Sequence, residues 1–401
     1  SIMQLRNTSN NAHVNVFTLA GGPAFAVDGT INSVNIGKGA NSVANNTVLG
    51  EGALDASVTG NNNTAIGKNA LTTLTSGAKN TAVGQVALED LTTGNNNCAI
   101  GSDALKNITT GSSNVALGVD TLQALTTASN NTAIGNTALS ANTSGTQNTA
   151  VGALSLDANT TGNNSTALGY NALSECTTGA QNTALGALAL DANTTANNNT
   201  AVGFSALTAN TTGGFNTAVG SESMILLTTG SQNVGVGYET LQSLTTADGN
   251  TAIGMRALQA TTTGANNTAI GVQALYANTT ADANTGVGQN ALVNNTTGHS
   301  NVAVGALALD ANTTGNKNNA IGKEALSTNT TGSNNNSFGM QSLQVNTTGT
   351  DNTAIGHAAL ASNTTASSNT AIGSSALIAN TTGTNLAAVG ANALAANTTA
   401  N

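Results

Sequence analysis

Polar and apolar positions recur along this chain with a fixed period of 17 residues. In segments such as Asn63-Thr-Ala-Ile-Gly67, side chains of two kinds alternate over four positions, which is typical of a short β-strand. A glycine closes each segment, and these glycines follow one another at constant 17-residue steps from Gly50 to Gly390, giving 21 consecutive units without insertion or deletion. A repeat of this length and regularity indicates a solenoid, with one strand in each unit.

The second half of each unit predicts a turn that returns the chain to the next strand. Leu stands four residues after the glycine in 20 of the 21 units, and Met224 replaces it once. An Asn-Thr-Thr-Gly segment follows, with Asn first and Gly fourth as β-turns favour. Ala replaces that last Gly in six units, so we expect a negative φ there. The invariant glycine that closes the strand should instead need a positive φ or lack room for a Cβ.

These elements predict an all-β fold, a β-solenoid (β-roll) of about 21 coils that occupies residues 46–401. Stacking at about 4.8 Å per coil gives a rod roughly 100 Å long, in which equivalent residues form ladders. The ladder residues expected in the first coils are Gly67, Gly84 and Gly101, Leu71, Leu88 and Leu105, Ile66, Val83 and Ile100, and Asn63, Asn80 and Asn97.

Residues 1–45 lack the repeat and are predicted to cap the rod or to connect it to a preceding domain. Met3, Leu5, Val14, Val16 and Phe17 indicate short strands in this segment. The 13-residue step from Gly37 to Gly50 predicts an irregular first coil.

The two faces of the predicted strand carry no charge in any unit. Thr64 and Ile66 lie on one face, and Asn63 and Ala65 lie on the other. We expect the Leu and Ile/Val ladders to line the interior of the coil and the Ala face to meet the same strand of another subunit. Because two large apolar side chains per unit offset little of the entropy of ordering 17 residues, the pattern favours a homotrimer.

Composition and charge argue against several classes of function. Only 6% of residues are charged, the net charge is -9, and no basic run could neutralise a nucleic-acid backbone. No stretch approaches the 18 or so apolar residues of a membrane-spanning helix, so no membrane insertion is expected. Cys98 and Cys176 fall in different columns of the repeat, four to five coils apart, which excludes a disulfide within one chain.

Candidate chemistry is sparse. His13, His299 and His357 have no Asp or Cys constellation around them, and there is no phosphate-binding Gly-Lys-Ser/Thr element. We therefore expect no catalytic, cofactor-binding or metal site, no cofactor and no enzyme activity.

The segments Asn63-Thr-Ala-Ile-Gly-Lys-Asn-Ala-Leu71 and Asn80-Thr-Ala-Val-Gly-Gln-Val-Ala-Leu88 resemble repeats of phage tail fibres and of related appendages that carry an intramolecular chaperone. They are also similar to the head repeats of trimeric autotransporter adhesins, whose Asn-Ser-Val-Ala-Ile-Gly unit forms a trimeric left-handed β-roll. The resemblance covers residues 46–401. It implies a virion surface appendage or, alternatively, a bacterial cell-surface protein. Since the chain stops within a unit at Asn401, we expect further sequence downstream, and its removal by a self-cleaving chaperone is one explanation.

Our leading hypothesis is a homotrimeric shaft of a virus tail fibre or similar appendage, serving as a rigid spacer and as a contact surface for host attachment. Expected partners are further copies of the chain, other fibre or baseplate proteins through residues 1–45, and a cell-surface glycan or protein receptor. Four aromatic residues are candidates for a glycan contact, although scattered exposure explains them more simply: Tyr170, Phe204, Tyr238 and Tyr276.

Two alternatives remain open. One is a bacterial adhesin head of the trimeric autotransporter type. The other is an ice-binding β-solenoid, which the paired Thr columns make worth testing, although adjacent Thr residues should point to opposite sides.

Overall fold

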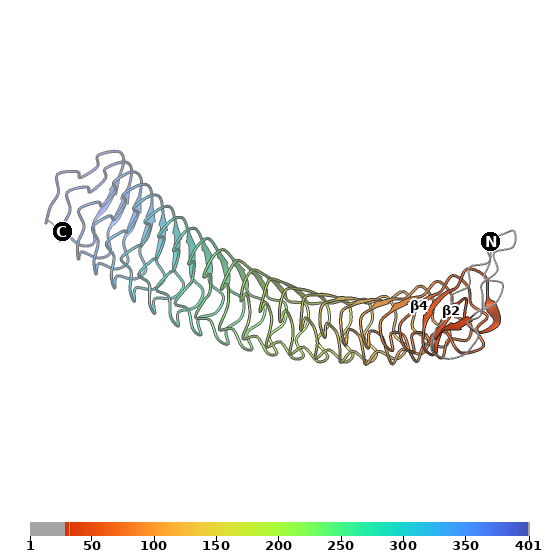
Figure 1. The fold of residues 1–401 in the computed structure, drawn as a ribbon. Coiled ribbons are helices and arrows are strands. Elements are labelled where there is room, and N and C mark those ends of the chain that lie inside the picture. The colour runs from red at the N-terminus through yellow and green to blue at the C-terminus, as the bar shows by residue number, and fades with distance from the viewer. Residues whose placement is uncertain (1–28, 32, 400–401) are drawn as a thin grey trace, which may run out of the picture.

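The chain forms a long, gently curved rod of stacked coils, shown in Figure 1. This computed structural model describes residues 29–31 and 33–399. The strands expected within residues 1–28 therefore lie outside the described residues.

The coils are held together by one sheet in which each strand pairs in parallel with the strand 17 residues further on. Between β4 and β5, for example, Thr64 lies opposite Thr81 and Ala65 opposite Ala82. The same register continues to the last pair, β22 and β23, where Thr370 lies opposite Ala387. Each unit thus makes one complete turn, and the predicted 17-residue β-solenoid is confirmed.

The parallel strands have the following bounds: β3 Thr47–Gly50, β4 Thr64–Ile66, β5 Thr81–Val83, β6 Cys98–Ile100, β7 Val115–Leu117, β8 Thr132–Ile134, β9 Thr149–Val151, β10 Thr166–Leu168, β11 Thr183–Leu185, β12 Thr200–Val202, β13 Thr217–Val219, β14 Val234–Val236, β15 Thr251–Ile253, β16 Thr268–Ile270, β17 Thr285–Val287, β18 Val302–Val304, β19 Asn319–Ile321, β20 Asn336–Phe338, β21 Thr353–Ile355, β22 Thr370–Ile372 and β23 Ala387–Val389.

The N-terminal end of the sheet is antiparallel. Strand β1 (Gly29–Ile31) pairs antiparallel with β2 (Val34–Gly37), and β2 pairs antiparallel with β3. A short 3-10 turn, η1 (Ala40–Ser42), lies between β2 and β3. The 13-residue step from Gly37 to Gly50 is therefore an antiparallel return of the chain and not a shortened coil.

The interior of each coil is filled from the Ala face of the strand and from the Leu of the opposite turn. Ala65, Asn63 and Leu71 have no exposed surface. The residue before each glycine points outward instead, and Ile100 is 38% exposed. The prediction of an Ile/Val ladder inside the coil, with the Ala face against another subunit, was wrong.

The size of the coil explains this inversion. Gly235 and Gly286 occupy the Ala position in two units. A Cβ added at Gly286 would already lie 3.4 Å from Leu275 Cδ1, and one at Gly235 would lie 2.9 Å from Met224 Cε. In the coils after β3 the space between the strand and the Leu column therefore suits a methyl group, because interiors pack without spare volume, whereas at the end of the stack Val48 of β3 takes the same inner position and is buried. Ala fits on the inner face, and Ile or Val must take the outer one.

From Gly67 to Gly373, the glycines that close the strands meet both expectations. At Gly152 φ is +134°, and an added Cβ would lie 2.4 Å from the carbonyl oxygen of Gly169 in the next coil. The turn glycines differ, since neither Gly162 nor Ala196, its equivalent two coils later, has a positive φ. The negative φ inferred from the Ala substitutions is confirmed for the described turns.

Two interior columns carry Asn in hydrogen-bonded ladders. The first runs along most of the rod, and the second begins at Asn142 and is interrupted where Leu, Cys or Thr takes the position. In the column that begins each strand segment, the Asn80 backbone N–H and Nδ2 donate to Asn63 Oδ1 over 2.9 and 3.2 Å, and Nδ2 also donates to the Gly94 carbonyl over 2.9 Å. In the turn column, Asn159 Nδ2 donates to Asn142 Oδ1 over 3.1 Å. Partners in the adjoining coil and turn satisfy these buried amides, which would otherwise be costly.

Three positions in each coil adopt a left-handed backbone although they are seldom occupied by glycine. In the coil after Gly67 they are Asn69, Leu71 and Lys79, with φ of 56°, 54° and 60°. Left-handed conformations cost about 1–2 kcal/mol for residues other than glycine, and Asn tolerates them best. For Leu71 complete burial and a 3.1 Å backbone hydrogen bond to the Ala87 carbonyl offset this cost.

Candidate functional site

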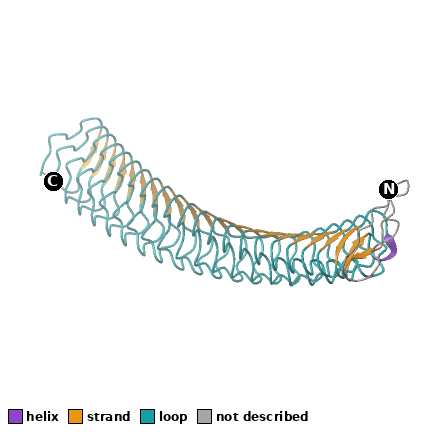
Figure 2. Cartoon of the chain, in the orientation of Figure 1, coloured by secondary structure: helices purple, strands orange, loops and turns teal. Residues whose placement is uncertain are grey.

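The outer face of the sheet carries uncharged side chains in every coil from β3 to β23. We call the residues that precede each strand-closing glycine the apolar stripe. In chain order from β3 to β23 they are Leu49, Ile66, Val83, Ile100, Leu117, Ile134, Val151, Leu168, Leu185, Val202, Val219, Val236, Ile253, Ile270, Val287, Val304, Ile321, Phe338, Ile355, Ile372 and Val389. The strands follow the concave side of the rod, as Figure 2 shows.

A second column, mostly Thr, accompanies the stripe on the outer face. It consists of the first residue of each three-residue strand, such as Thr251 and Thr268, and these side chains are half-buried between neighbours. Cys98, Val115 and Asn336 are among its exceptions, and no member is charged. The outer face is thus a band of Thr methyl and hydroxyl groups beside aliphatic side chains.

The stripe leaves much apolar surface uncovered in a single chain. Excluding the terminal Val389, twelve of its residues are 36–45% exposed. Full burial of such a side chain is worth about 1.5–3 kcal/mol, so covering the remaining two-fifths would contribute ~0.6–1.2 kcal/mol each. Twelve of them give roughly 7–14 kcal/mol from each chain that is covered, while association costs ~4–15 kcal/mol.

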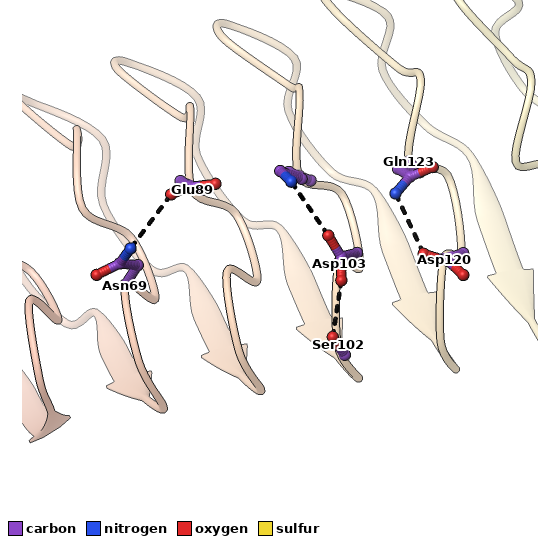
Figure 3. A network of polar contacts seen from close by, with 7 residues as sticks. Asn69, Glu89, Ser102, Asp103, Asp120 and Gln123 are labelled. Carbon is purple, nitrogen blue, oxygen red and sulfur yellow. Dashed lines mark hydrogen bonds and ion pairs between the residues drawn. The ribbon is translucent and has the colours of Figure 1, made fainter.

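Most charged and long polar side chains lie in the bends that follow the strand-closing glycine and the Leu of each coil. We call these bends the corners, and they lie away from the outer face. Figure 3 shows one such region after strands β4 to β7. Asn69 Nδ2 donates to Glu89 Oε1 over 3.5 Å, and Gln123 Nε2 donates to Asp120 Oδ1 over 3.1 Å. The hydroxyl of Ser102, which donates to Asp103 over 2.7 Å, is the main cause that lowers the pKa of that carboxyl group.

A larger polar network lies near the middle of the rod. Arg256 Nε is 2.7 Å from Glu239 Oε2, which also accepts a 2.8 Å hydrogen bond from Gln259 Nε2. The Tyr238 hydroxyl and then Arg256 lower the pKa of the Glu239 carboxyl group. These contacts join successive coils through their corners and leave the sheet face uncharged.

The aromatic residues singled out from the sequence fall into two groups. Tyr170, Phe204 and Tyr238 each directly follow a strand-closing glycine and are 56%, 53% and 44% exposed. They are 34 residues apart, which is two coils or about 10 Å along the rod. Tyr276 follows a Leu and belongs to another column. Three of the four thus form one rank with regular spacing, which the sequence reading did not recognise.

The paired Thr columns lie at the turn, and neither member is buried. Thr92 Oγ1 donates to the Thr109 carbonyl over 2.9 Å, and the same bond recurs coil after coil, as between Thr143 and Thr160. Thr93 is exposed. The first Thr column therefore acts as part of the stacking ladder.

The two cysteines have different surroundings. Cys98 is half-buried in the Thr column of the outer face, whereas Cys176 replaces an interior Asn and has no exposed surface. Burial raises the pKa of the Cys176 thiol to about 11. Both cysteines are free.

No group of three or more His, Cys, Asp or Glu that could hold a metal ion occurs within residues 29–31 and 33–399. Over the same residues, none of the helical segments has the length and apolar character needed to cross a membrane.

No known protein-family model matches the chain, and no curated protein matches its sequence.

Proposed function

We propose that this chain is the shaft of a virus tail fibre or a similar surface appendage, a structural protein and not an enzyme, assembled as a homotrimer. The observation that carries the proposal is the unbroken register of the parallel sheet from β3 to β23. Every coil keeps the same 17-residue turn, so the fold extends in one dimension as a spacer must. The apolar stripe supplies a reason for the chain to associate.

The number of chains in the particle tests this proposal. Native mass spectrometry of the purified protein should give three times the 39.0 kDa mass of the chain. Electron microscopy of the same sample should show rods of uniform length. A stable monomer at micromolar concentration would count heavily against a trimeric shaft.

The proposed contact surface for host attachment is the rank of Tyr170, Phe204 and Tyr238. Exposed aromatic rings offer large contact area at low entropic cost, and residues of this type dominate recognition sites. Changing all three to Ser should abolish binding on an array of cell-surface glycans. Tyr276→Ser is the matched control, because it removes an aromatic ring from a different column. Equal binding by the triple variant and the control would exclude this surface.

A bacterial adhesin head is the second candidate, and it places the same rod on a cell surface. The gene sequence that flanks the segment encoding this chain distinguishes the two candidates. A tail fibre predicts an encoded chaperone domain, and an adhesin predicts an encoded outer-membrane anchor.

A further inference from the structure

We propose that copies of this chain meet through the outer face of the sheet, with the apolar stripe at the centre of the interface and the copies parallel and in register. This inference rests on the proposed shaft and specifies where its subunits join. It replaces the Ala face, which lies inside the coil and has no surface left to offer a partner.

The outer face can be covered without burying a charge. Its two columns contain no Asp, Glu, Lys or Arg in any of the 21 coils, whereas acidic and basic residues occur at the corners, as at Asp103, Glu239 and Arg256. Burying an unpaired charge costs far more than burying Thr or Ile. An interface that covered the corners would bury charged side chains in many coils and incur that free-energy cost each time. An interface over the outer face of the sheet buries none.

The regular spacing of the stripe favours another copy of the chain as the occupant. The stripe presents one aliphatic side chain per coil, at the inter-strand distance, from β3 to β23. A partner that covers it for its whole length must present side chains with the same spacing. A second copy of the chain has this spacing because it has the same fold. Identical subunits most often assemble with closed rotational symmetry.

The available surface is of the size that stable interfaces use. The twelve most exposed stripe residues correspond to roughly 300–600 Å² of apolar area per chain at ~25 cal/mol per Å². The remaining stripe residues and the Thr column add to this area. Specific interfaces bury about 800 Å² per partner, so the outer face alone comes close to what is required.

The parallel arrangement follows from the function of a shaft, whose two ends differ. If the copies are parallel and in register, each strand of one copy lies at the height of the same strand in the others. Cys98 in β6 then lies near Cys98 of each other copy. In an antiparallel arrangement of these 21 strands, β6 would lie opposite β20 and Asn336.

The test places like charges on two adjacent coils of the face. In the variant Ile253→Lys/Ile270→Lys, each copy would present two lysines to the others. The matched control Thr263→Lys/Thr280→Lys adds the same charge on exposed turn residues of the same two coils. We expect the face variant to raise the concentration for half-dissociation by roughly 100-fold or more, because like charges oppose association strongly. The control should keep the unmodified oligomeric mass.

Sedimentation and native mass spectrometry, with circular dichroism as the check on folding, separate the possible failures. If the unmodified chain assembles and the face variant assembles equally well, the interface lies elsewhere and the shaft proposal stands. If the unmodified chain is a monomer, both proposals fail.

The unmodified chain supplies a second measurement, which does not depend on the variants folding. Cys98 should react slowly with a maleimide in the assembly and faster when dilution separates the copies, while the buried Cys176 stays unreactive in both. An exposed reference, Thr263→Cys, should react at one rate throughout. When the slow reaction of Cys98 in the assembly is allowed to reach completion, a bifunctional maleimide should join Cys98 of one copy to Cys98 of another, as the parallel arrangement requires. Unprotected Cys98 in the assembled rod would overturn the proposed face, and the absence of cross-linked chains would overturn the parallel register.

Discussion

The register of the stack can be tested by comparing two glycines of one coil, Gly152 and Gly162. Gly152→Ala introduces a Cβ at φ +134°, a region that only glycine occupies readily, and that Cβ would lie 2.4 Å from the Gly169 carbonyl oxygen. Such a backbone conformation costs about 1–3 kcal/mol, and an overpacked contact costs about 1–3 kcal/mol more. The total is roughly 2–6 kcal/mol, applied at one coil.

Gly162→Ala is the control in the same coil. Its Cβ would also approach a carbonyl, that of Gly179 at 2.2 Å, but the φ is not positive and the equivalent residue two coils later is Ala196. The substitution should remove the 3.1 Å hydrogen bond from the Gly162 N–H to Asn159 Oδ1, at a cost of about 1 kcal/mol.

Amide hydrogen exchange measures the difference locally, because contacts in a solenoid join only neighbouring coils. For Gly152→Ala we expect amides of β9 and β10 to exchange roughly 30-fold faster or more, with distant strands unchanged. For Gly162→Ala the increase should be about 5-fold or less in the same strands. Equal effects of the two substitutions would refute the argument that a left-handed glycine fixes the stacking at each coil.

Three further predictions concern the interior and the polar corner. Asn267→Ala should destabilise the rod by about 3–5 kcal/mol in urea unfolding, because it leaves the next Asn backbone N–H and the Ala281 carbonyl without these partners. Asn278→Leu should cost less than about 1.5 kcal/mol, since other units carry Leu in that column, and a similar loss from both would contradict the ladder. The raised pKa of Cys176 makes the folded form hold its proton as the unfolded thiol loses it. Stability should therefore fall by about 2 kcal/mol as the pH rises from 9 to 11, and Cys176→Ser should abolish this component. The carboxyl group of Glu239 should titrate below its usual range by NMR, and Tyr238→Phe should raise its pKa, because the hydroxyl that favours the charged form is lost.

The period, the strand positions and the turns could be predicted from the sequence because each leaves a mark in a column of the repeat. The invariant glycines mark a position where a strongly positive φ is combined with a close carbonyl of the next coil, and the Ala residues in the turn exclude a left-handed backbone there. Leu125 and Leu227 in the turn Asn column predict that this column points inward, and both are fully buried. The residue types that occur at one position of the repeat thus show which side-chain sizes and backbone angles that position allows.

The direction of the strand faces could not be predicted in the same way. The alternation along a strand shows which residues share a face. Both faces are uncharged here, so the distribution of charge does not indicate which face lies inside the coil. The usual assumption that larger aliphatic residues lie inside favours Ile66 over Ala65, and the narrow coil reverses it. Only the distance from the strand to the Leu column decides the matter, and that distance is a property of the closed coil.

The left-handed residues were missed for a related reason. Asn69 has a side chain that tolerates this backbone and offers a weak signal. Leu71 offers none, since Leu is a poor choice for a positive φ and a good choice for a core. Its φ of 54° follows from closing a 17-residue coil around a Leu that must point inward.

The Asn ladders inside the coil determine how regularly the side chains of the apolar stripe are aligned on its outer face. Because Asn80 binds both Asn63 in the coil before and Gly94 in the turn beyond it, a shift of one coil against the next would leave buried amides without partners. Apolar contacts alone would permit such a shift, since they are not directional. The ladders therefore hold every coil to the same step, and the same step aligns the Ile and Val side chains of the stripe into one rank. A core of larger aliphatic residues would have supplied more burial per coil, but it would have left the register of that rank, and of any copy packed against it, less strictly defined.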